Sequence, residues 1–190
     1  MNLFIDTSNW NLILILEQDN LILDQVVVRN TKKVSDLLLV NIQSLFAKNQ
    51  LTIQDIKRFY LTTGPGSYTG ERVGLTFVKT LKVINPTYEV YLINSLAYQA
   101  GKGKKVSLLD ARGGKFYLGI YDNQQPLMAE QVIATDALTK LLATEVYQDF
   151  QVVQDYQDCD FSQHYLTLKP NFQLTNDPEL LTPTYLKPFL

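Results

Sequence analysis

Three glycines and a proline gather between residues 64 and 70, within the segment TTGPGSYTGERVG of residues 62–74. Gly64, Gly66 and Gly70 lie between an apolar run and a segment of helical periodicity, where phosphate-binding loops occur. Their spacing is G-x-G-x-x-x-G, whereas the dinucleotide fingerprint has its third glycine one position earlier. A Walker loop has a lysine after its last glycine, and here Glu71 follows. Neither phosphate motif is therefore present.

The acidic side chain after the last glycine also opposes phosphate binding. Glu71 stands where a bound anion would meet the helix N-terminus, although its charge suits the helix dipole. We interpret the segment as a tight turn whose glycines let the backbone pass close to another segment, with Ser67 or Thr69 capping the helix. A purely structural strand-to-helix turn remains an equal alternative.

Two aspartates end apolar runs at matching places in the two halves of the chain, Asp6 in the first and Asp110 in the second. Two carboxylates on paired strands facing a cleft would suit Mg-nucleotide chemistry. Asn9 and Trp10 follow where a phosphate-binding turn would have glycine, so a strand-end turn is the preferred interpretation of Asp6. The candidate residues of a vestigial nucleotide site are Asp6, Thr7, Ser8, Gly64, Gly66, Ser67 and Asp110.

The other reactive side chains are too isolated to predict a site. His164 is the only histidine, without a Cys or His at ligand spacing, so we expect no metal site, and no G-x-S-x-G motif is present. Cys159 is the only cysteine, which excludes an intrachain disulfide and fits a reducing compartment. Lys102, Lys104 and Lys105 form a short basic run, interpreted as a solvated linker, with an RNA-facing patch as the alternative.

The composition indicates a globular protein with a substantial core. Of 190 residues, 46% are hydrophobic, and the net charge is only −2, which gives no general surface for polyanions. The N-terminal residues lack the basic region and cleavage signal of a secretion peptide, and no apolar run approaches the roughly 18 residues of a membrane span. We therefore expect a soluble cytoplasmic protein with no membrane partner.

Periodicity predicts the elements that must position these residues. Apolar runs rich in Ile, Leu and Val predict strands at 2–6, 11–18, 21–28, 59–63, 89–93, 105–111, 115–122, 128–134 and 150–154. Helices are expected at 35–48, 70–84 and 94–100, and around residues 138–142. The order β-β-β-α-β-α-β-α occurs once in full and once shortened, which predicts an α/β fold of two lobes, 1–101 and 102–190.

Two of these helices carry more apolar positions than one buried face requires. Leu37 and Val40 point away from the buried stripe of the first, and Leu75 and Val78 are spread around the second. Gly74, inside the second helix, costs about 1 kcal/mol relative to alanine, which suggests close approach of another helix. Exposed apolar faces of this kind meet a partner or a second copy of the chain. The candidate partner-binding residues are Leu37, Val40, Gly70, Arg72, Gly74, Leu75 and Val78.

The segment GPGSYTGERVGLTFVKTL closely resembles the signature GPGSFTGxRxG…K of the TsaB (YeaZ) family. Four further segments resemble family motifs, in the same order over nearly the whole chain: LFIDTS, SDLLLVNIQSLF, LLDARGGKFYLGIY and PTYLKP. The chain departs from the family at Val34 (where His is usual), Val40 (Pro), Lys115 (Glu) and Lys187 (Arg). These departures affect roles assigned to the four side chains and leave the expected fold unchanged.

The resemblance implies an actin/Hsp70/sugar-kinase-like (ASKHA) fold with a reduced second lobe. It implies a non-catalytic subunit that docks on and stabilises a TsaD-like subunit in a heterodimer. Together with a TsaE-like ATPase, the pair transfers threonylcarbamoyl to adenosine 37 of tRNAs reading ANN codons (t6A formation). The isolated chain would need no cofactor, ATP and Mg²⁺ being used by its partners, and it would meet tRNA through the complex. The alternatives are an ATP-dependent small-molecule kinase of the same fold and a metallo-glycopeptidase.

Overall fold

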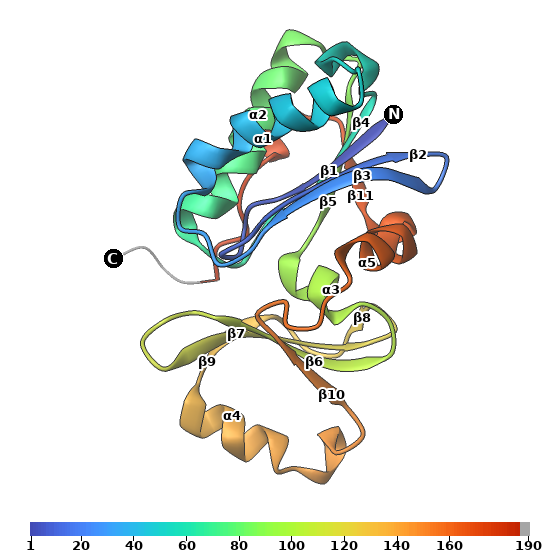
Figure 1. The fold of residues 1–190 in the computed structure, drawn as a ribbon. Helices are drawn as coiled ribbons and strands as arrows, with labels where there is room; N and C mark the ends of the chain where they lie inside the picture. The colour runs from blue at the N-terminus through green and yellow to red at the C-terminus, as the bar shows by residue number, and fades with distance from the viewer. Residues whose placement is uncertain (187–190) are drawn as a thin grey trace.

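Two β-sheets stacked on each other, with helices outside and between them, form the molecule, whose computed structural model describes residues 1–186 (Figure 1). The strands are β1 (Asn2–Asp6), β2 (Leu12–Gln18), β3 (Leu21–Val28), β4 (Arg58–Thr62), β5 (Glu89–Ile93), β6 (Lys104–Asp110), β7 (Lys115–Asp122), β8 (Gln125–Pro126), β9 (Gln131–Ala134), β10 (Gln151–Gln154) and β11 (Gln173–Thr175). The α-helices are α1 (Val34–Lys48), α2 (Tyr68–Ile84), α3 (Ser95–Ala100), α4 (Thr135–Leu142) and α5 (Phe161–Leu168).

The first sheet has the strand order β11-β5-β4-β1-β2-β3. Its central strands β1, β4 and β5 are parallel, and β2, β3 and β11 run antiparallel to their neighbours. Side chains alternate between the two faces, so that Leu3 and Ile5 pack under α1 and α2 while Phe4 packs on the opposite face. Because both faces are covered, β1 is buried along its whole length.

The second sheet has the order β10-β6-β7-β8, with β9 also paired to β7. Its outer face packs on α4 through Val106, Leu108 and Leu138, and Figure 1 shows α4 below this sheet. Its inner face contributes Leu109 and Tyr121 to a cluster that also contains residues of the first sheet. The second lobe is therefore one sheet covered by one α-helix on its outer side.

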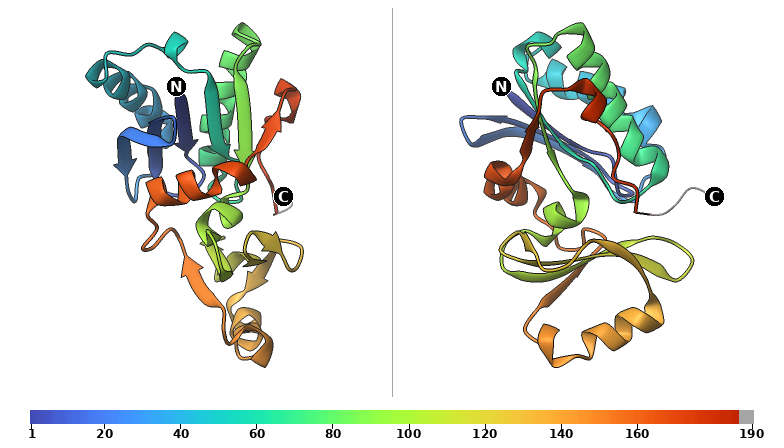
Figure 2. Two further views of the ribbon diagram at one scale, coloured as in Figure 1. Left: turned by 90° about the vertical axis from the view of Figure 1, so that its right-hand side faces the viewer. Right: turned by 180° about the vertical axis from the view of Figure 1, so that it is seen from behind.

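Helices α3 and α5 lie between the two sheets, as the two turned views in Figure 2 show. Together with both inner sheet faces they build one buried group, here called the interlobe cluster. Its members include Phe4, Ile13, Ile15, Tyr60, Leu96, Tyr98, Leu109, Tyr117, Tyr121, Tyr156, Phe161, Tyr165 and Phe172. The ring of Phe4 stacks on Tyr98 at 4.9 Å and contacts Tyr165 at 5.2 Å. The lobes are thus joined by a continuous core.

The C-terminal segment differs most from the sequence-based expectation. No helix or strand was expected after residue 154, but α5 forms there and β11 pairs with β5 at the edge of the first sheet. Phe161, Tyr165 and Leu168 are spaced four and three residues apart, so one helical face is buried in the interlobe cluster. The division at residues 101 and 102 remains a prediction, although β11 belongs to the first sheet.

Smaller differences concern element ends. Helix α1 begins at Val34, one residue before the expected start at residue 35. The strand expected at 128–134 is limited to β9, and Gln125–Pro126 pairs separately with the end of β7 as β8. Helix α2 begins at Tyr68, and the expected cap at Ser67 is confirmed, since its side chain accepts a hydrogen bond from the Gly70 N–H.

Candidate functional site in the cleft between the lobes

The glycine segment packs directly against the turn that follows β1. The Ser67 N–H donates to the Ser8 carbonyl oxygen at 2.6 Å, and the Thr7 hydroxyl donates to the Gly70 carbonyl oxygen at 2.7 Å. A Cβ atom on Gly66 would overlap the Ser8 carbonyl oxygen, and one on Gly70 would overlap that of Thr7. The expectation that these glycines allow a close backbone approach is therefore confirmed, and the neighbouring segment is the β1 turn.

Gly74, one turn further along α2, also lies close to β1 and the turn that follows it. A Cβ there would lie 2.9 Å from the Thr7 hydroxyl oxygen and 3.3 Å from a methyl carbon of Ile5, and the Gly74 N–H donates to that hydroxyl at 3.1 Å. The expectation of a helix-to-helix approach at Gly74 is wrong, because this face of α2 lies against the chain's own first strand.

Three backbone N–H groups of the glycine segment already donate hydrogen bonds within the segment or to the β1 turn. The Gly70 N–H donates to the Ser67 hydroxyl at 3.4 Å and the Glu71 N–H to the Ser67 carbonyl oxygen at 2.8 Å, beside the Ser67 to Ser8 bond. A phosphate loop presents such groups to its ligand. These three N–H groups instead hold the turn and the start of α2.

Asp6 is 1% exposed and holds its own turn together. One carboxylate oxygen accepts from the Ser8 N–H at 2.8 Å and from the Ser8 hydroxyl at 2.7 Å, and the other accepts from the Tyr156 hydroxyl at 2.7 Å. The Ser8 hydroxyl lies 2.7 Å from that of Ser95 at the start of α3. Burial raises the pKa of Asp6, although these hydrogen bonds oppose the shift.

Asp110 is exposed in the cleft, on the wall opposite the glycine loop. It lines a cavity of about 280 Å³ with Trp10, Gly66, Ser67 and other residues of both lobes. One of its carboxylate oxygens accepts from the Arg112 N–H at 2.7 Å. Asp6 does not line this cavity, so the alternative of two carboxylates facing one cleft does not hold, and Asp6 is the strand-end turn residue that was preferred. Among the other candidates, Thr7 lines an adjoining cavity together with Ser67.

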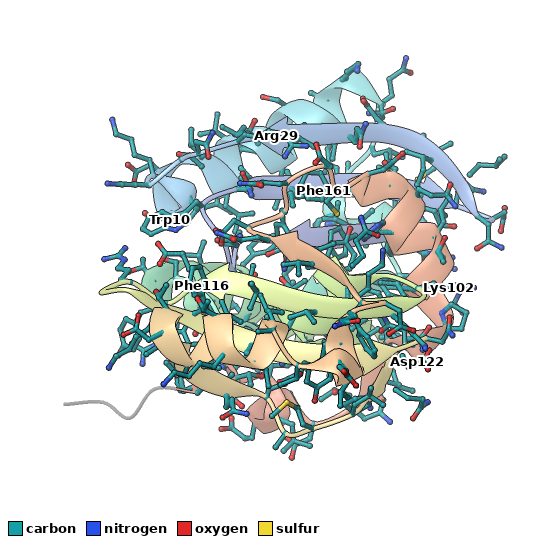
Figure 3. The ribbon with its side chains drawn as sticks, turned by 90° about the horizontal axis from the view of Figure 1, so that it is seen from below. Trp10, Arg29, Lys102, Phe116, Asp122 and Phe161 are labelled. Carbon is teal, nitrogen blue, oxygen red and sulfur yellow. The ribbon has the colours of Figure 1, made fainter. Side chains whose placement is uncertain are left out.

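Sequence reasoning gave no role to Trp10 and Arg112, which separate these two cavities. The Arg112 guanidinium lies 4.7 Å from the centre of the Trp10 ring, and the Lys32 ammonium lies 5.7 Å from it. Figure 3 shows Trp10 between the strands of the first sheet and the ribbon of β7. The aromatic residue beside Asp6-Thr7-Ser8 was the available signal, whereas Tyr156 lies 150 positions from its partner Asp6 and had none.

Glu71 lies under the glycine loop and is 3% exposed. The Gly66 N–H donates to its carboxylate, while its Oε2 atom has no hydrogen-bond partner among the described residues. Burial raises the pKa of this carboxyl to about 7, and the Gly66 bond and Arg72 oppose the shift. A half-neutral carboxyl below the loop makes the site less suitable for an anion.

The apolar candidates for partner binding divide between core and surface. Leu75 and Val78 are 2% and 0% exposed within the core under α1 and α2, so the expectation that they lie on an exposed face is wrong. Their positions face the first sheet because the covered arc of α2 is wider than one stripe. Leu37 is half-buried, and Val40 is 58% exposed on α1.

An apolar groove of about 380 Å³ follows the exposed side of α2, lined by Tyr68, Thr69, Arg72, Val73, Thr76 and Phe77. The Arg72 guanidinium lies 3.9 Å from the centre of the Tyr68 ring, and its Nε donates to the Tyr185 hydroxyl at 2.7 Å. Arg72 thus joins α2 to the segment near the C-terminus that contains the PTYLKP motif, of which Lys187 lies outside the described residues.

The structure also places His164 and Lys104, which were noted in the sequence. His164 lies on α5, and its Nδ1 atom is 3.4 Å from the Cys159 sulfur and 3.2 Å from the Tyr98 carbonyl oxygen. Lys104 pairs with Asp149 at 2.6 Å. Within residues 1–186, no three His, Cys, Asp or Glu side chains gather closely enough to hold a metal ion. In the same part of the chain, no helix is long and apolar enough to span a membrane.

Comparison with known proteins places this geometry in a family. Residues 26–173 match the family model described as TsaD, tRNA N6-adenosine threonylcarbamoyltransferase. The Bacillus subtilis protein named tRNA threonylcarbamoyladenosine biosynthesis protein TsaB is 31% identical over 136 residues, which cover 69% of this chain and 58% of the relative. The uncharacterized protein MG208 homolog of Mycoplasma pneumoniae is 28% identical over 97% of this chain and 94% of its own length.

The solved structure of YeaZ from Pseudomonas aeruginosa shares the fold, with a TM-score of 0.75 and 17% identity over 97% of this chain and 99% of that one. The expected α/β, ASKHA-like fold with two lobes is confirmed by the two sheets and by this match. Taken with the family model over residues 26–173, these matches show that the chain belongs to the TsaD family, as a member of its TsaB (YeaZ) type.

Proposed function

We propose that this chain is a non-catalytic subunit of the machinery that forms t6A, and that it docks on and stabilises a TsaD-like subunit. The observation that carries the proposal is the state of Asp6. Both oxygens of this carboxylate are bound by Ser8 and Tyr156, and the side chain is buried. A carboxylate that must bind Mg²⁺ needs an oxygen facing the cleft. Asp6 therefore offers no oxygen to a metal ion in the cleft.

The surface of α1 and α2 supports the docking role. Leu39 and Val40 are 54% and 58% exposed on α1, and the apolar groove beside Val73 and Phe77 follows α2. The two helices lie side by side over the first sheet in Figure 1. Two adjacent helices with exposed apolar side chains can pack on two helices of a partner as a four-helix bundle. Without the partner, the same face would form a two-fold homodimer.

The rest of the proposal follows the family. A TsaE-like ATPase completes the complex, ATP and Mg²⁺ are used by the partners, and the product is threonylcarbamoyl on adenosine 37 of tRNAs reading ANN codons. The chain meets tRNA through the complex, and the work takes place in the cytoplasm. The name of the Bacillus subtilis relative and the TsaD description of the family model support this assignment.

Reconstitution tests the proposal. The purified chain should co-purify with its TsaD-like partner, and formation of t6A by the partner and the ATPase should require it. The chain alone should neither hydrolyse ATP nor modify tRNA. Robust ATP turnover by the lone chain, retained after further purification, would instead favour the small-molecule kinase of the same fold. Catalysis that requires an added metal and cleaves a glycopeptide would favour the glycopeptidase.

A further inference from the structure

A further cavity is lined by residues of both lobes, and Asp6, Thr7 and Ser8 are not among them. It measures about 630 Å³, within the range of about 300–1,000 Å³ that small-molecule sites occupy. Its walls come from the ends of β4 and β5, from α3, from the β7–β8 turn, from β11 and from residues 180–184. The last of these segments is tied to β4, because the Thr184 N–H donates to the Thr63 carbonyl oxygen at 2.7 Å. The cavity is thus built from distant parts of the chain.

The lining of this cavity is rich in hydrogen-bonding groups and carries one charge. Side-chain amides and hydroxyls come from Thr63, Asn94, Tyr121, Gln124, Gln125, Asn171, Gln173, Thr175, Thr182 and Thr184. Glu130 is the one acidic residue of the lining, and none of the described lining residues is Lys or Arg. A ligand held here would therefore meet acceptors on several sides and a single negative charge.

The Glu130 carboxylate is held in place by neutral donors. One oxygen accepts from the Tyr121 hydroxyl and the other from the Asn94 amide at 2.6 Å. Partial burial raises the pKa of Glu130, and no cation contributes to lowering it. Glu17 in the same chain shows the usual solution, since Lys169 lies 2.8 Å from its buried carboxylate and the pKa of Glu17 is lowered. Charges removed from water are normally paired in this way.

We propose that this cavity binds a small organic cation, whose ammonium or guanidinium group pairs with Glu130. Gln124, Gln125 and Gln173 line the cavity, and their amide oxygens can accept the ligand's remaining donors. The site is separate from the Asp6 turn and from the apolar face of α1 and α2. Its ligand class is therefore independent of the proposed role in t6A formation.

Calorimetry on the full chain tests this inference with matched probes. Putrescine and agmatine carry the required cations, and 1,4-butanediol has the length of putrescine without its charges. Putrescine and agmatine should bind at pH 8, and the diol should not. Absence of heat from both amines at millimolar concentration, or equal binding of the diol, would overturn the proposal.

Two variants and one control locate the binding. Glu130→Gln keeps the size of the side chain and removes its charge, so the affinity for putrescine should fall by about tenfold or more. Glu145→Gln removes an exposed carboxylate outside the cavity and should bind as the parent does. Gln173→Lys places a competing cation on exposed β11 and should abolish binding even if Glu130→Gln fails to fold. Unchanged affinity in either cavity variant would contradict the assignment.

Discussion

At the scale of single residues, three buried carboxylates are accommodated in three ways. Glu17 pairs with Lys169, and its pKa is lowered. Asp6 receives only neutral donors, and its pKa is raised by burial. Glu71 receives the Gly66 N–H on one side and leaves Oε2 without a partner among the described residues. Only the first arrangement favours the charged form, so the other two carboxylates reduce stability when they ionise.

Glu71 predicts a pH dependence of stability. Its pKa is about 7 in the folded protein and 4.5 ordinarily, so its contribution is fully present below pH 4.5 and is lost as the pH rises through 7. Glu71→Gln should leave the free energy of unfolding nearly unchanged at pH 4 and raise it at pH 8, by up to about 3 kcal/mol at roughly 1.4 kcal/mol per pKa unit. Urea unfolding at both pH values measures this, and an equal change at both would contradict it.

Gly66 predicts the effect of one added methyl group. In Gly66→Ala the Cβ atom would overlap the Ser8 carbonyl oxygen, which is backbone and cannot turn away. The loop must then move and lose the Ser67 to Ser8 hydrogen bond, at a cost of about 1–3 kcal/mol. Thermal unfolding should show a lower Tm than for Thr69→Ala, which changes an exposed residue in the first turn of α2. Equal Tm values would mean that the loop does not depend on this contact.

At the scale of elements, α1 and α2 carry both buried residues that stabilise the fold and exposed residues that are proposed to dock on the partner. Val78 is fully buried, so a charge there would destabilise the core and could not report on a partner. Val40 is 58% exposed, so a charge there stays in water in the free chain, which makes Val40→Glu the useful change. The sequence pattern identified both valines as candidates, and the structure distinguishes the buried one from the exposed one.

Val40→Glu should weaken docking on the TsaD-like partner while the chain stays folded. A charge placed inside an apolar interface costs several kcal/mol when it has no counter-ion. Pull-down with the partner and light scattering of the free chain measure the hetero- and homodimer. Gln43→Glu, also exposed on α1, is the control for added charge. A folded Val40→Glu that forms both complexes normally would place the interface elsewhere on the molecule.

The elements that could be predicted from sequence were those with strong local patterns. β1, β3 and β7 were expected with their observed bounds, because continuous or alternating apolar runs mark them. Helix α5 was missed, since its buried positions Phe161 and Tyr165 stand among polar neighbours. The glycine loop was recognised as a close approach, but its neighbour, the Thr7–Ser8 backbone, is 58 or more positions away and depends on tertiary structure.

At the scale of the whole molecule, the two lobes share the interlobe cluster and the bond between Tyr156 and Asp6. Tyr156 follows β10 of the second sheet, is fully buried, and its N–H also donates to the Gln99 side chain at 2.5 Å. A nucleotide-binding enzyme with two lobes opens and closes around its substrate. Here an opening motion would expose the aromatic cluster and remove the Tyr156 hydroxyl from Asp6, so we expect the lobes to remain closed and to unfold together.

Tyr156→Phe tests this coupling, because it removes one hydroxyl and keeps the ring in the cluster. Loss of the donor to buried Asp6 should lower the free energy of unfolding by about 1–3 kcal/mol. Since both sheets pack on the same cluster, hydrogen exchange should accelerate by the same factor in β1 and β2 as in β6 and β7. Tyr147→Phe, a change on the outer side of the second sheet, serves as the control. Acceleration confined to β6 and β7 would show that the second lobe opens by itself, and the closed, scaffold-like behaviour expected of the molecule would then be wrong.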